Sequence, residues 1–253
     1  MLAPATRKIE VPLVEVFSSL QGEGIMIGCR QIFVRFAGCN LTCDYCDTQF
    51  HEELIFNVET EPGSKQFMTL ENPANLNELK HVILDWQCRC NNVHQSVSLT
   101  GGEPLLHADK LKVWLPEILP ILPIYLETNG TLPDELRDIL PLVSMISMDI
   151  KLHSTSGTDT AWDLHANFMA LGAEKLCQVK LVVDASTTAE ELIRAGKLVS
   201  QYAPGCPLIL QPRTLASGLS LDGRSLLELQ KIAGSAHHDI RVIPQIHHWL
   251  GVC

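Results

Sequence analysis

The sequence predicts an α/β fold, a partial and open parallel βα barrel of about six βα units, fewer than the eight of a full barrel. Short β-branched and aromatic runs alternate with longer stretches of helical periodicity. Polar, glycine-rich segments follow the carboxyl ends of three predicted strands, at 100–104 (TGGEP), 127–130 (ETNG) and 211–214 (QPRT). Barrels and open α/β sheets place their functional sites at these ends.

Each element is predicted from a local signal. Strands are expected where short apolar runs end at turn residues. The first helix is expected around 79–86, because its apolar residues recur on one helix face, with Asn75 or Asn77 as the N-cap. The remaining predicted elements are strands at 13–17, 31–36, 96–99, 124–127, 143–149, 176–183, 208–211 and 240–243, and helices at 111–119, 133–140, 161–171, 187–202 and 221–233.

Two helix starts have explicit sequence signals. Pro133 suits the first position of a helix, where its missing N–H costs nothing. Thr187 followed three residues later by Glu190 predicts a capping box. One segment, at about 47–75, is rich in Glu, Thr and Pro and carries no recognisable motif. We therefore expect a single domain over 1–253 with an irregular insertion at 47–75, serving as a partner site or a lid.

Composition excludes several classes of protein. The chain has 19 Lys and Arg against 29 Asp and Glu, a net charge of −10, which argues against non-specific nucleic-acid binding. Its apolar runs are far shorter than the ~18 residues of a membrane span. The first residues lack the apolar region of a signal peptide, so a cytoplasmic protein is expected. Nine cysteines in such a protein indicate metal ligands or buried thiols rather than disulfides.

The sharpest signal is a cluster of three cysteines. Cys39, Cys43 and Cys46 form a C-x3-C-x2-C pattern, and soft thiolates select zinc, Cu(I) or an iron–sulfur cluster. A closed zinc site needs a fourth ligand, for which His51 is the nearest candidate, so a zinc knuckle stays an alternative. Three ligands on a four-iron cluster leave one iron open, which a reactive cluster requires.

These motifs lead to a family. The cysteine pattern, with Tyr45 before its last Cys, resembles the radical S-adenosylmethionine (SAM) superfamily, and TGGEP is similar to that superfamily's GGE motif. More narrowly, EVFSSLQGEG (15–24), FVRFAGCN (33–40), CDT (46–48), ETNG and the tail PQIHHWLGVC (244–253) resemble the 7-carboxy-7-deazaguanine synthases. The resemblance extends from about Val14 to Cys253.

The resemblance implies a radical-SAM carbon–nitrogen lyase. Its reaction would contract 6-carboxy-5,6,7,8-tetrahydropterin to 7-carboxy-7-deazaguanine with loss of ammonia, in the biosynthesis of queuosine and related deazapurines. Cys39, Cys43 and Cys46 would be the catalytic residues that hold a [4Fe–4S] cluster, SAM would chelate the open iron, and Thr48 would contact Mg²⁺. The family further implies an external electron donor of the flavodoxin or ferredoxin type, and its small enzymes often form homodimers.

The resemblance also implies two binding surfaces. The loop after the first strand would recognise the pterin, Arg35 would pair with its carboxylate, and the chain end would reach the substrate. The expected substrate residues are Leu20, Gln21, Gly22, Glu23, Arg35, Thr100 and Cys253. The expected SAM residues are Tyr45, Cys46, Asp47, Gly102, Ser147, Asp149, Lys151, Gln211, Pro212, Arg213 and Thr214. Glu103 is expected to accept a hydrogen bond from the SAM ammonium.

The sequence departs from the family's pattern at two places. The segment SMDIK at 147–151 stands where relatives have a shorter SPK, which leaves the register there open. Arg213 replaces an apolar residue, so its role is open.

Two alternatives of other kinds remain. The first is a different radical-SAM enzyme, such as an activase acting on a glycyl-radical partner, against which QGEG, CDT and the Q-x-H tail count. The second is a non-enzymatic zinc- or cluster-binding module. Cys88 and Cys90 could support a second cluster with Cys177 or Cys206, but the strand and helix positions of the latter two favour buried thiols.

Overall fold

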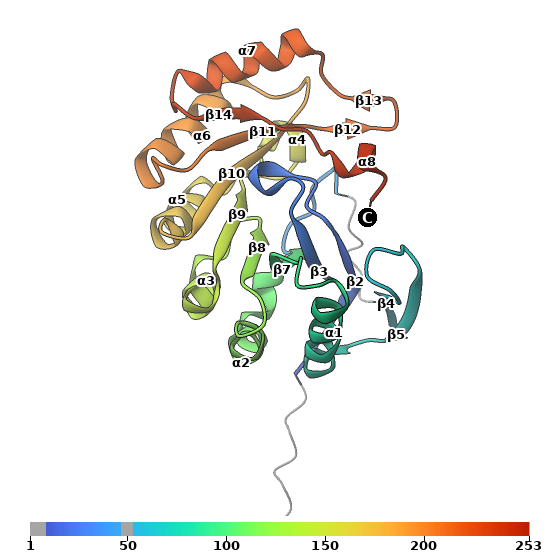
Figure 1. Cartoon of the computed structure of the whole chain (residues 1–253). Coiled ribbons are helices and arrows are strands. Elements are labelled where there is room, and N and C mark those ends of the chain that lie inside the picture. The colour runs from blue at the N-terminus through green and yellow to red at the C-terminus, as the bar shows by residue number, and fades with distance from the viewer. Residues whose placement is uncertain (1–8, 47–52, 253) are drawn as a thin grey trace, which may run out of the picture.

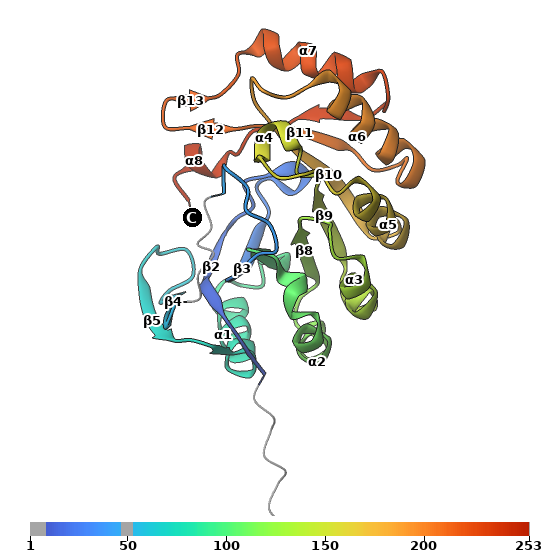
Figure 2. The same ribbon diagram turned by 180° about the vertical axis from the view of Figure 1, so that it is seen from behind.

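A ten-stranded sheet forms the centre of the molecule, in the order β14-β11-β10-β9-β8-β7-β3-β2-β4-β5. The computed structural model describes residues 9–46 and 53–252. The strands fan out in an arc, with the helices arranged along the outside of that arc (Figures 1 and 2). The sheet begins at β14 and ends at β5 without closing on itself, so the prediction of an open barrel is confirmed.

Seven strands of this sheet run parallel, and each neighbouring pair is joined by a helical crossover. The parallel strands are β3 (Arg30–Phe36), β7 (Ser96–Gly101), β8 (Ile124–Thr128), β9 (Met145–Asp149), β10 (Leu176–Val183), β11 (Leu208–Pro212) and β14 (Ile240–Val242). The crossover helices are α1 (Leu76–Arg89), α2 (Ala108–Ile118), α3 (Pro133–Ile139), α5 (Trp162–Gly172), α6 (Ala189–Tyr202) and α7 (Gly223–Gly234). This alternation is the one the sequence predicts.

The other end of the sheet is mixed rather than parallel. β2 (Leu13–Leu20) runs antiparallel to β3 and parallel to β4 (Ile55–Glu59), and β5 (Phe67–Glu71) turns back antiparallel along β4. β1 (Glu10–Val11) pairs with β6 (Ala74–Asn75) in a separate two-stranded sheet.

The expectation of an irregular insertion is therefore wrong for residues 55–71, which form a hairpin at the edge of the sheet. In β4, Phe56 and Val58 are buried while Ile55 is exposed, which is an alternation of only a few residues. Every residue of β5 is exposed, so its sequence carries no inside–outside pattern. An edge strand of this kind is not distinguishable from a loop by periodicity.

Helix caps agree with the sequence in one case and differ by one residue in another. The Asn75 side chain accepts a hydrogen bond from the Asn77 amide at 3.1 Å and caps α1. In α6 the capping box consists of Thr188 and Glu191, whereas the sequence predicts Thr187 and Glu190. The Thr187 hydroxyl is already used in the turn before the helix, where it accepts a hydrogen bond from the Asp184 amide at 2.9 Å.

The hydrophobic core lies between the sheet and its helices. Trp114 of α2 and Phe168 of α5 are fully buried, and the Trp114 indole donates to the Leu76 carbonyl at 2.7 Å. This satisfies the one polar atom that the large ring brings into the core. Among the described residues, no helix combines the length and the apolar character needed to cross a bilayer.

Short elements gather at the carboxyl ends of the strands. They are η2 (Pro104–His107) after β7, α4 (His153–Ser156) after β9, β12 (Thr214–Leu215) and β13 (Gly218–Leu219) after β11, and α8 (His247–Leu250) after β14, while η3 (Leu140–Leu142) extends α3. The short helix η1 (Gly24–Met26) follows the antiparallel strand β2, whose carboxyl end pairs with the start of β3, and it packs against β10, where the Ile25 amide donates to Gln178 Oε1 at 2.8 Å. Because carboxyl ends of parallel strands meet at one edge, these segments surround a common space.

Candidate active site

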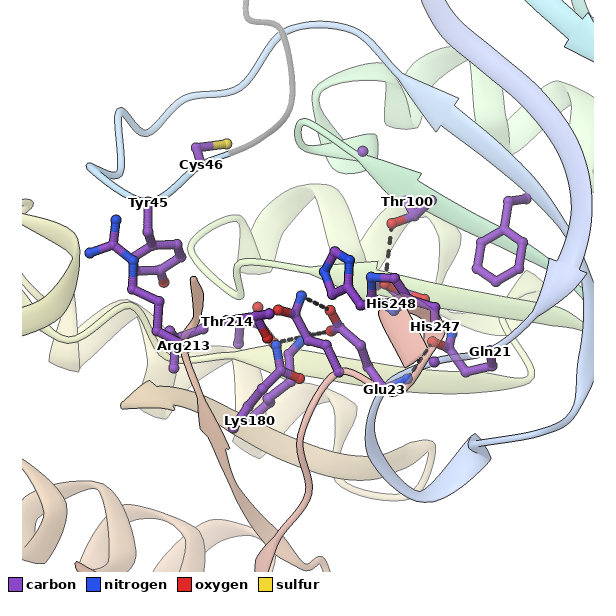
Figure 3. Close-up of a pocket in the computed structure, with 18 of the residues that line it drawn as sticks. Gln21, Glu23, Tyr45, Cys46, Thr100, Lys180, Arg213, Thr214, His247 and His248 are labelled. Carbon is purple, nitrogen blue, oxygen red and sulfur yellow. Dashed lines mark hydrogen bonds and ion pairs between the residues drawn. The ribbon is translucent and has the colours of Figure 1, made fainter. Parts of the chain in front are cut away.

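Two adjoining cavities lie at the carboxyl ends of the strands. The larger has a volume of about 570 Å³ and the smaller about 110 Å³. Figure 3 shows the side chains that meet in this region, which come from both ends of the chain. Residues that line both cavities are Tyr45, Cys46, Thr100, Gly101, Glu127, Asp149, Lys151 and Lys180.

The cysteine loop follows β3 and rests on the TGGEP turn. The Gly102 amide donates to the Phe36 carbonyl at 2.9 Å, and the Glu103 amide donates to the Gly38 carbonyl at 2.9 Å. A Cβ on Gly102 would lie 1.7 Å from the Gly38 carbonyl oxygen. Only glycine therefore permits this backbone contact, which sets the position of the residue before Cys39.

Cys39, Cys43 and Cys46 all line the smaller cavity. Burial raises the pKa of the Cys39 and Cys43 thiols. Within the described part of the chain, no set of three or more Cys, His, Asp or Glu side chains is gathered tightly enough to hold a single metal ion. A four-iron cluster makes a different demand, because each thiolate binds a separate iron. Three thiols around one small cavity fit such a cluster better than a single zinc ion.

A charged network occupies the floor of the larger cavity. Lys180 of β10 forms an ion pair with Glu23, and its ammonium lies 3.4 Å from Asp149 Oδ1. Lys151 donates to Asp149 Oδ2 at 2.7 Å. Burial alone would raise the pKa of Glu23, but the charge and hydrogen bond of Lys180, with smaller contributions from Gln245 and His247, lower it to about 2. Glu23 is therefore a carboxylate and a pure acceptor at neutral pH.

Glu127, at the end of β8, accepts hydrogen bonds from two other pocket residues, Gln21 and Thr100, and from Ser98 of β7. Its carboxylate accepts hydrogen bonds from Gln21 at 2.8 Å, Ser98 at 3.1 Å and Thr100 at 3.1 Å. Burial raises the pKa of Glu127, with Lys180 opposing that shift. The residue thus connects the loop after β2 to the ends of β7 and β8.

One end of the larger cavity carries polar atoms without a protein partner. The Tyr45 hydroxyl, Gln211 Oε1 and Thr214 Oγ1 are buried and unpaired, and all three residues line this cavity. The Tyr45 ring has Lys151 5.5 Å from its centroid and the Arg213 guanidinium at 5.9 Å. Figure 3 shows Arg213 beside Tyr45, close to Cys46. Buried unpaired polar atoms facing a cavity indicate a ligand that would satisfy them.

The opposite end of the cavity is closed by the C-terminal segment. The Ile246 amide donates to the Gly22 carbonyl at 2.9 Å, and Gln245 donates to Glu23 Oε1 at 2.7 Å. A Cβ on Gly22 would lie 2.2 Å from His247 Nδ1, so the loop and the tail are in close contact. Arg35 also lines the cavity, with its guanidinium 2.8 Å from Glu15 Oε1.

Most of the predicted residues meet in these cavities. Those that line one or both are Leu20, Gln21, Gly22, Glu23, Arg35, Cys39, Cys43, Tyr45, Cys46, Thr100, Gly102, Asp149, Lys151, Gln211, Arg213 and Thr214. Asp47, Thr48, His51 and Cys253 lie outside the described residues.

Three predicted residues lie elsewhere. Ser147 is buried and accepts a hydrogen bond from Gln178 at 2.8 Å, and Pro212 lines neither cavity. Glu103 faces the core, where it accepts hydrogen bonds from Leu105, Thr128 and Asn129. Burial raises its pKa to about 7.

Sequence reasoning missed four residues of the site. Lys180 reads as an ordinary residue in an apolar strand, and Gln245 and His247 were noted only as part of the tail. Glu127 belongs to the ETNG segment, and its position at the end of a predicted strand is the signal that could have identified it. The prediction of buried thiols is confirmed for Cys206, while Cys177 is half-buried. Burial raises the pKa of Cys177 to about 11 and that of Cys206 to about 12.

Comparison with known proteins decides the family. Residues 33–157 match the Radical SAM superfamily. The 7-carboxy-7-deazaguanine synthase of Geobacter sulfurreducens is 43% identical over 241 residues, which cover 94% of this chain and 96% of the relative. The chain belongs to the 7-carboxy-7-deazaguanine synthase family.

Further relatives agree with this family. The synthase of the same name from Methanothermobacter thermautotrophicus is 33% identical over 268 residues, with 96% of this chain and 98% of the relative covered. The crystal structure of QueE from Escherichia coli shares the fold, with a TM-score of 0.59 and 21% identity over 94% of each chain. Membership in the family identifies the chain as a radical-SAM enzyme and implies a [4Fe–4S] cluster and SAM, in agreement with the cysteine motif.

Proposed function

We propose that this enzyme contracts 6-carboxy-5,6,7,8-tetrahydropterin to 7-carboxy-7-deazaguanine with release of ammonia, in the biosynthesis of queuosine and related deazapurines. The full-length similarity to synthases of that name carries the proposal. The geometry supports it, because one continuous set of residues joins the cysteine loop to a pocket with fixed hydrogen-bond acceptors.

The proposed cofactors fit the smaller cavity and the adjoining end of the larger one. Cys39, Cys43 and Cys46 would hold the [4Fe–4S] cluster. The unpaired Gln211 Oε1 and Thr214 Oγ1 suit the amino and hydroxyl groups of an adenosine, and Tyr45 offers an aromatic face beside them. When bound, the cluster and SAM supply the radical that removes a hydrogen atom from the substrate, chemistry that no side chain provides.

The proposed substrate fits the other end. A pterin presents N–H groups on its pyrimidine ring, and these require acceptors. Glu23 is held ionised there, next to Gln21, whose amide oxygen accepts from the Glu23 amide at 3.0 Å. Arg35 offers a guanidinium for the substrate carboxylate, a pairing that favours bidentate geometry.

Several finer assignments belong to the same proposal. Mg²⁺ at Thr48 would follow the preference of this ion for oxygen ligands and retained waters. Asp47 would contact SAM and the chain end at Cys253 would contact the substrate, as in the motifs they match. The proposal also includes an external electron donor of the flavodoxin or ferredoxin type, a homodimeric assembly and a cytoplasmic location.

The test is an anaerobic assay of the iron-reconstituted protein with SAM, a reductant, Mg²⁺ and 6-carboxytetrahydropterin. Mass spectrometry of the pterin-derived product is the readout, and the same mixture without SAM is the control. We expect a deazaguanine carboxylate. Cleavage of SAM to 5′-deoxyadenosine with the pterin returned unchanged would refute the proposed substrate, while the cluster assignment would stand. If a fully loaded cluster supports neither SAM cleavage nor conversion of the pterin, the proposed reaction class is refuted.

A further inference from the structure

We propose that Lys180 is a positioning residue that links the two halves of the site, holding the Glu23 carboxylate in place for the substrate while contacting Asp149 on the SAM side. This inference rests on the proposed function, because it assigns Glu23 to the pterin. It gives a role to a buried lysine that neither the cysteine motif nor the loop motifs include.

The geometry of Lys180 is that of a bridge. Its side chain is 9% exposed and projects from β10 between the loop after β2 and the end of β9. Its ammonium pairs with Glu23 Oε2 and lies 3.4 Å from Asp149 Oδ1, and it lines both cavities. Figure 3 shows Lys180 and Glu23 directed toward each other in the pocket. Each partner carboxylate also has a second donor, Gln245 on Glu23 and Lys151 on Asp149.

Charge explains why this position needs a lysine. Burial by itself would lower the pKa of Lys180, but Asp149, Glu23 and Glu127 raise it, so the ammonium stays protonated. Without that ammonium, Glu23 and Asp149 would be buried near Glu127, with Lys151 beside Asp149 and the smaller contribution of His247 at Glu23 left to balance them. Neighbouring buried carboxylates favour uptake of a proton by one of them. A protonated Glu23 would present a donor where the N–H groups of a pterin need an acceptor.

The chain contains a matched lysine with a purely architectural role. Lys175 lies just before β10, at the amino end of the strand, and its ammonium donates to the carbonyls of Leu140 at 2.7 Å and Val143 at 2.6 Å. It has no carboxylate partner among these contacts and lines neither cavity. Loss of its ammonium should therefore affect folding stability but not ligand binding.

The test measures binding without turnover. Cluster-loaded protein is titrated with pterin-6-carboxylate in the absence of reductant, with and without SAM, for wild type, Lys180→Met, Glu23→Gln, the double variant and Lys175→Met. Removing one partner of a buried charge pair is costly, so Lys180→Met should raise the pterin Kd by about tenfold or more. In the Glu23→Gln background, Lys180→Met should raise the pterin Kd less than about threefold, because the Glu23 carboxylate that the lysine balances is already absent.

Coupling between the two ligands is the second readout. We expect SAM to change the pterin Kd in wild type and to lose most of that effect in Lys180→Met, since the bridge between the half-sites is removed. Lys175→Met should lower the melting temperature and leave both constants near their wild-type values. A structural role alone would not produce this difference between the two lysines.

Three results would overturn the inference. They are an unchanged pterin Kd in Lys180→Met, additive effects in the double variant, or an equal loss of affinity in Lys175→Met. If wild type converts the pterin to product and one of these results is found, only the role of Lys180 has failed. If wild type neither binds nor converts the pterin, the proposed function has failed first, and the role assigned to Lys180 fails with it.

Discussion

Two polar networks on the same sheet each contain acidic and basic side chains but have opposite characters. The open network, defined as Glu23, Glu127, Asp149, Lys151 and Lys180, lies at the carboxyl ends of the parallel strands and lines the cavities. The closed network, defined as Ser18, Arg30, Glu59, Gln87 and His94, lies between β2, β3, β4 and α1 and lines neither cavity.

The closed network is saturated by its own members and the backbone. The Ser18 hydroxyl contacts His94 Nε2 at 2.8 Å, and His94 Nδ1 contacts Gln87 Oε1 at 2.9 Å. Glu59 accepts three backbone amides, from Ser18 at 2.9 Å, Gly63 at 2.9 Å and Lys65 at 2.7 Å, and so fastens the β4–β5 hairpin to the sheet.

The contrast shows that residue type alone does not mark a site. Ser18 and His94 make the serine–histidine contact of a hydrolytic triad, with the Gln87 amide where the acid would stand, yet the serine already accepts a hydrogen bond from Arg30 at 3.0 Å and lines neither cavity. The open network instead keeps charged groups beside space that a ligand can fill. Changes there should alter ligand binding, and changes in the closed network should alter stability.

The largest expected effect tests the cluster end of the open region. Alanine at Cys39, Cys43 or Cys46 should abolish assembly of the catalytic cluster, since among the described residues these three thiols are the ones that line the smaller cavity. Iron content and the brown absorbance of anaerobically purified protein are the readouts. Cys88→Ala, at an exposed position in α1, is the control and should retain full iron. Full iron in any of the three variants would contradict the ligand assignment.

A single methyl group should have the next largest effect. In Gly102→Ala the new Cβ meets the Gly38 carbonyl, so the backbone before Cys39 must move. We expect iron incorporation to fall severalfold and product formation with it. Gly234→Ala is the matched control, because a Cβ there has no neighbour within 4 Å. Equal iron content in the two variants would show that the cysteine loop does not depend on this contact.

Arg35→Lys separates charge from geometry in the substrate pocket. The lysine keeps the positive charge but loses the planar fork, so KM for the pterin should rise by about tenfold with a smaller change in kcat. Steady-state kinetics at saturating SAM measures both constants. Arg137→Lys, an exposed pair with Asp134, provides the comparison and should behave as wild type. A fall in kcat alone would place Arg35 outside substrate binding.

The smallest expected effect belongs to the closed network and concerns stability. Burial lowers the pKa of His94 to about 4, so its neutral form stabilises the fold above pH 6.5 and this contribution is lost as the pH falls toward 4. Between pH 7 and pH 5 wild type should lose about 1–2 kcal/mol more unfolding free energy than His94→Gln. Urea unfolding at both pH values measures the difference. KM and kcat at neutral pH should be unchanged; a large kinetic effect would break the distinction between the two networks.

The sequence by itself determined the alternation of strands and helices and the chemistry of the cysteine loop. Apolar periodicity located β10 at Leu176–Val183 without error, and Pro133 marked the start of α3. These features depend on residues only a few positions apart, and local backbone preferences are therefore readable along the chain. The motif segments of the site were predicted in the same way, because most of them lie at or just after the end of a strand.

Only the tertiary structure decided which charged groups meet and which strands form the edge. Lys180 and Glu23 are separated by 157 positions, and nothing near either residue in the sequence predicts their ion pair. Ser147 points to Gln178 rather than to the cavity, and β5 shows no pattern because all of its side chains are exposed. Such outcomes depend on register across the sheet and on the cost of burying charge. Both become defined only when distant segments pack together.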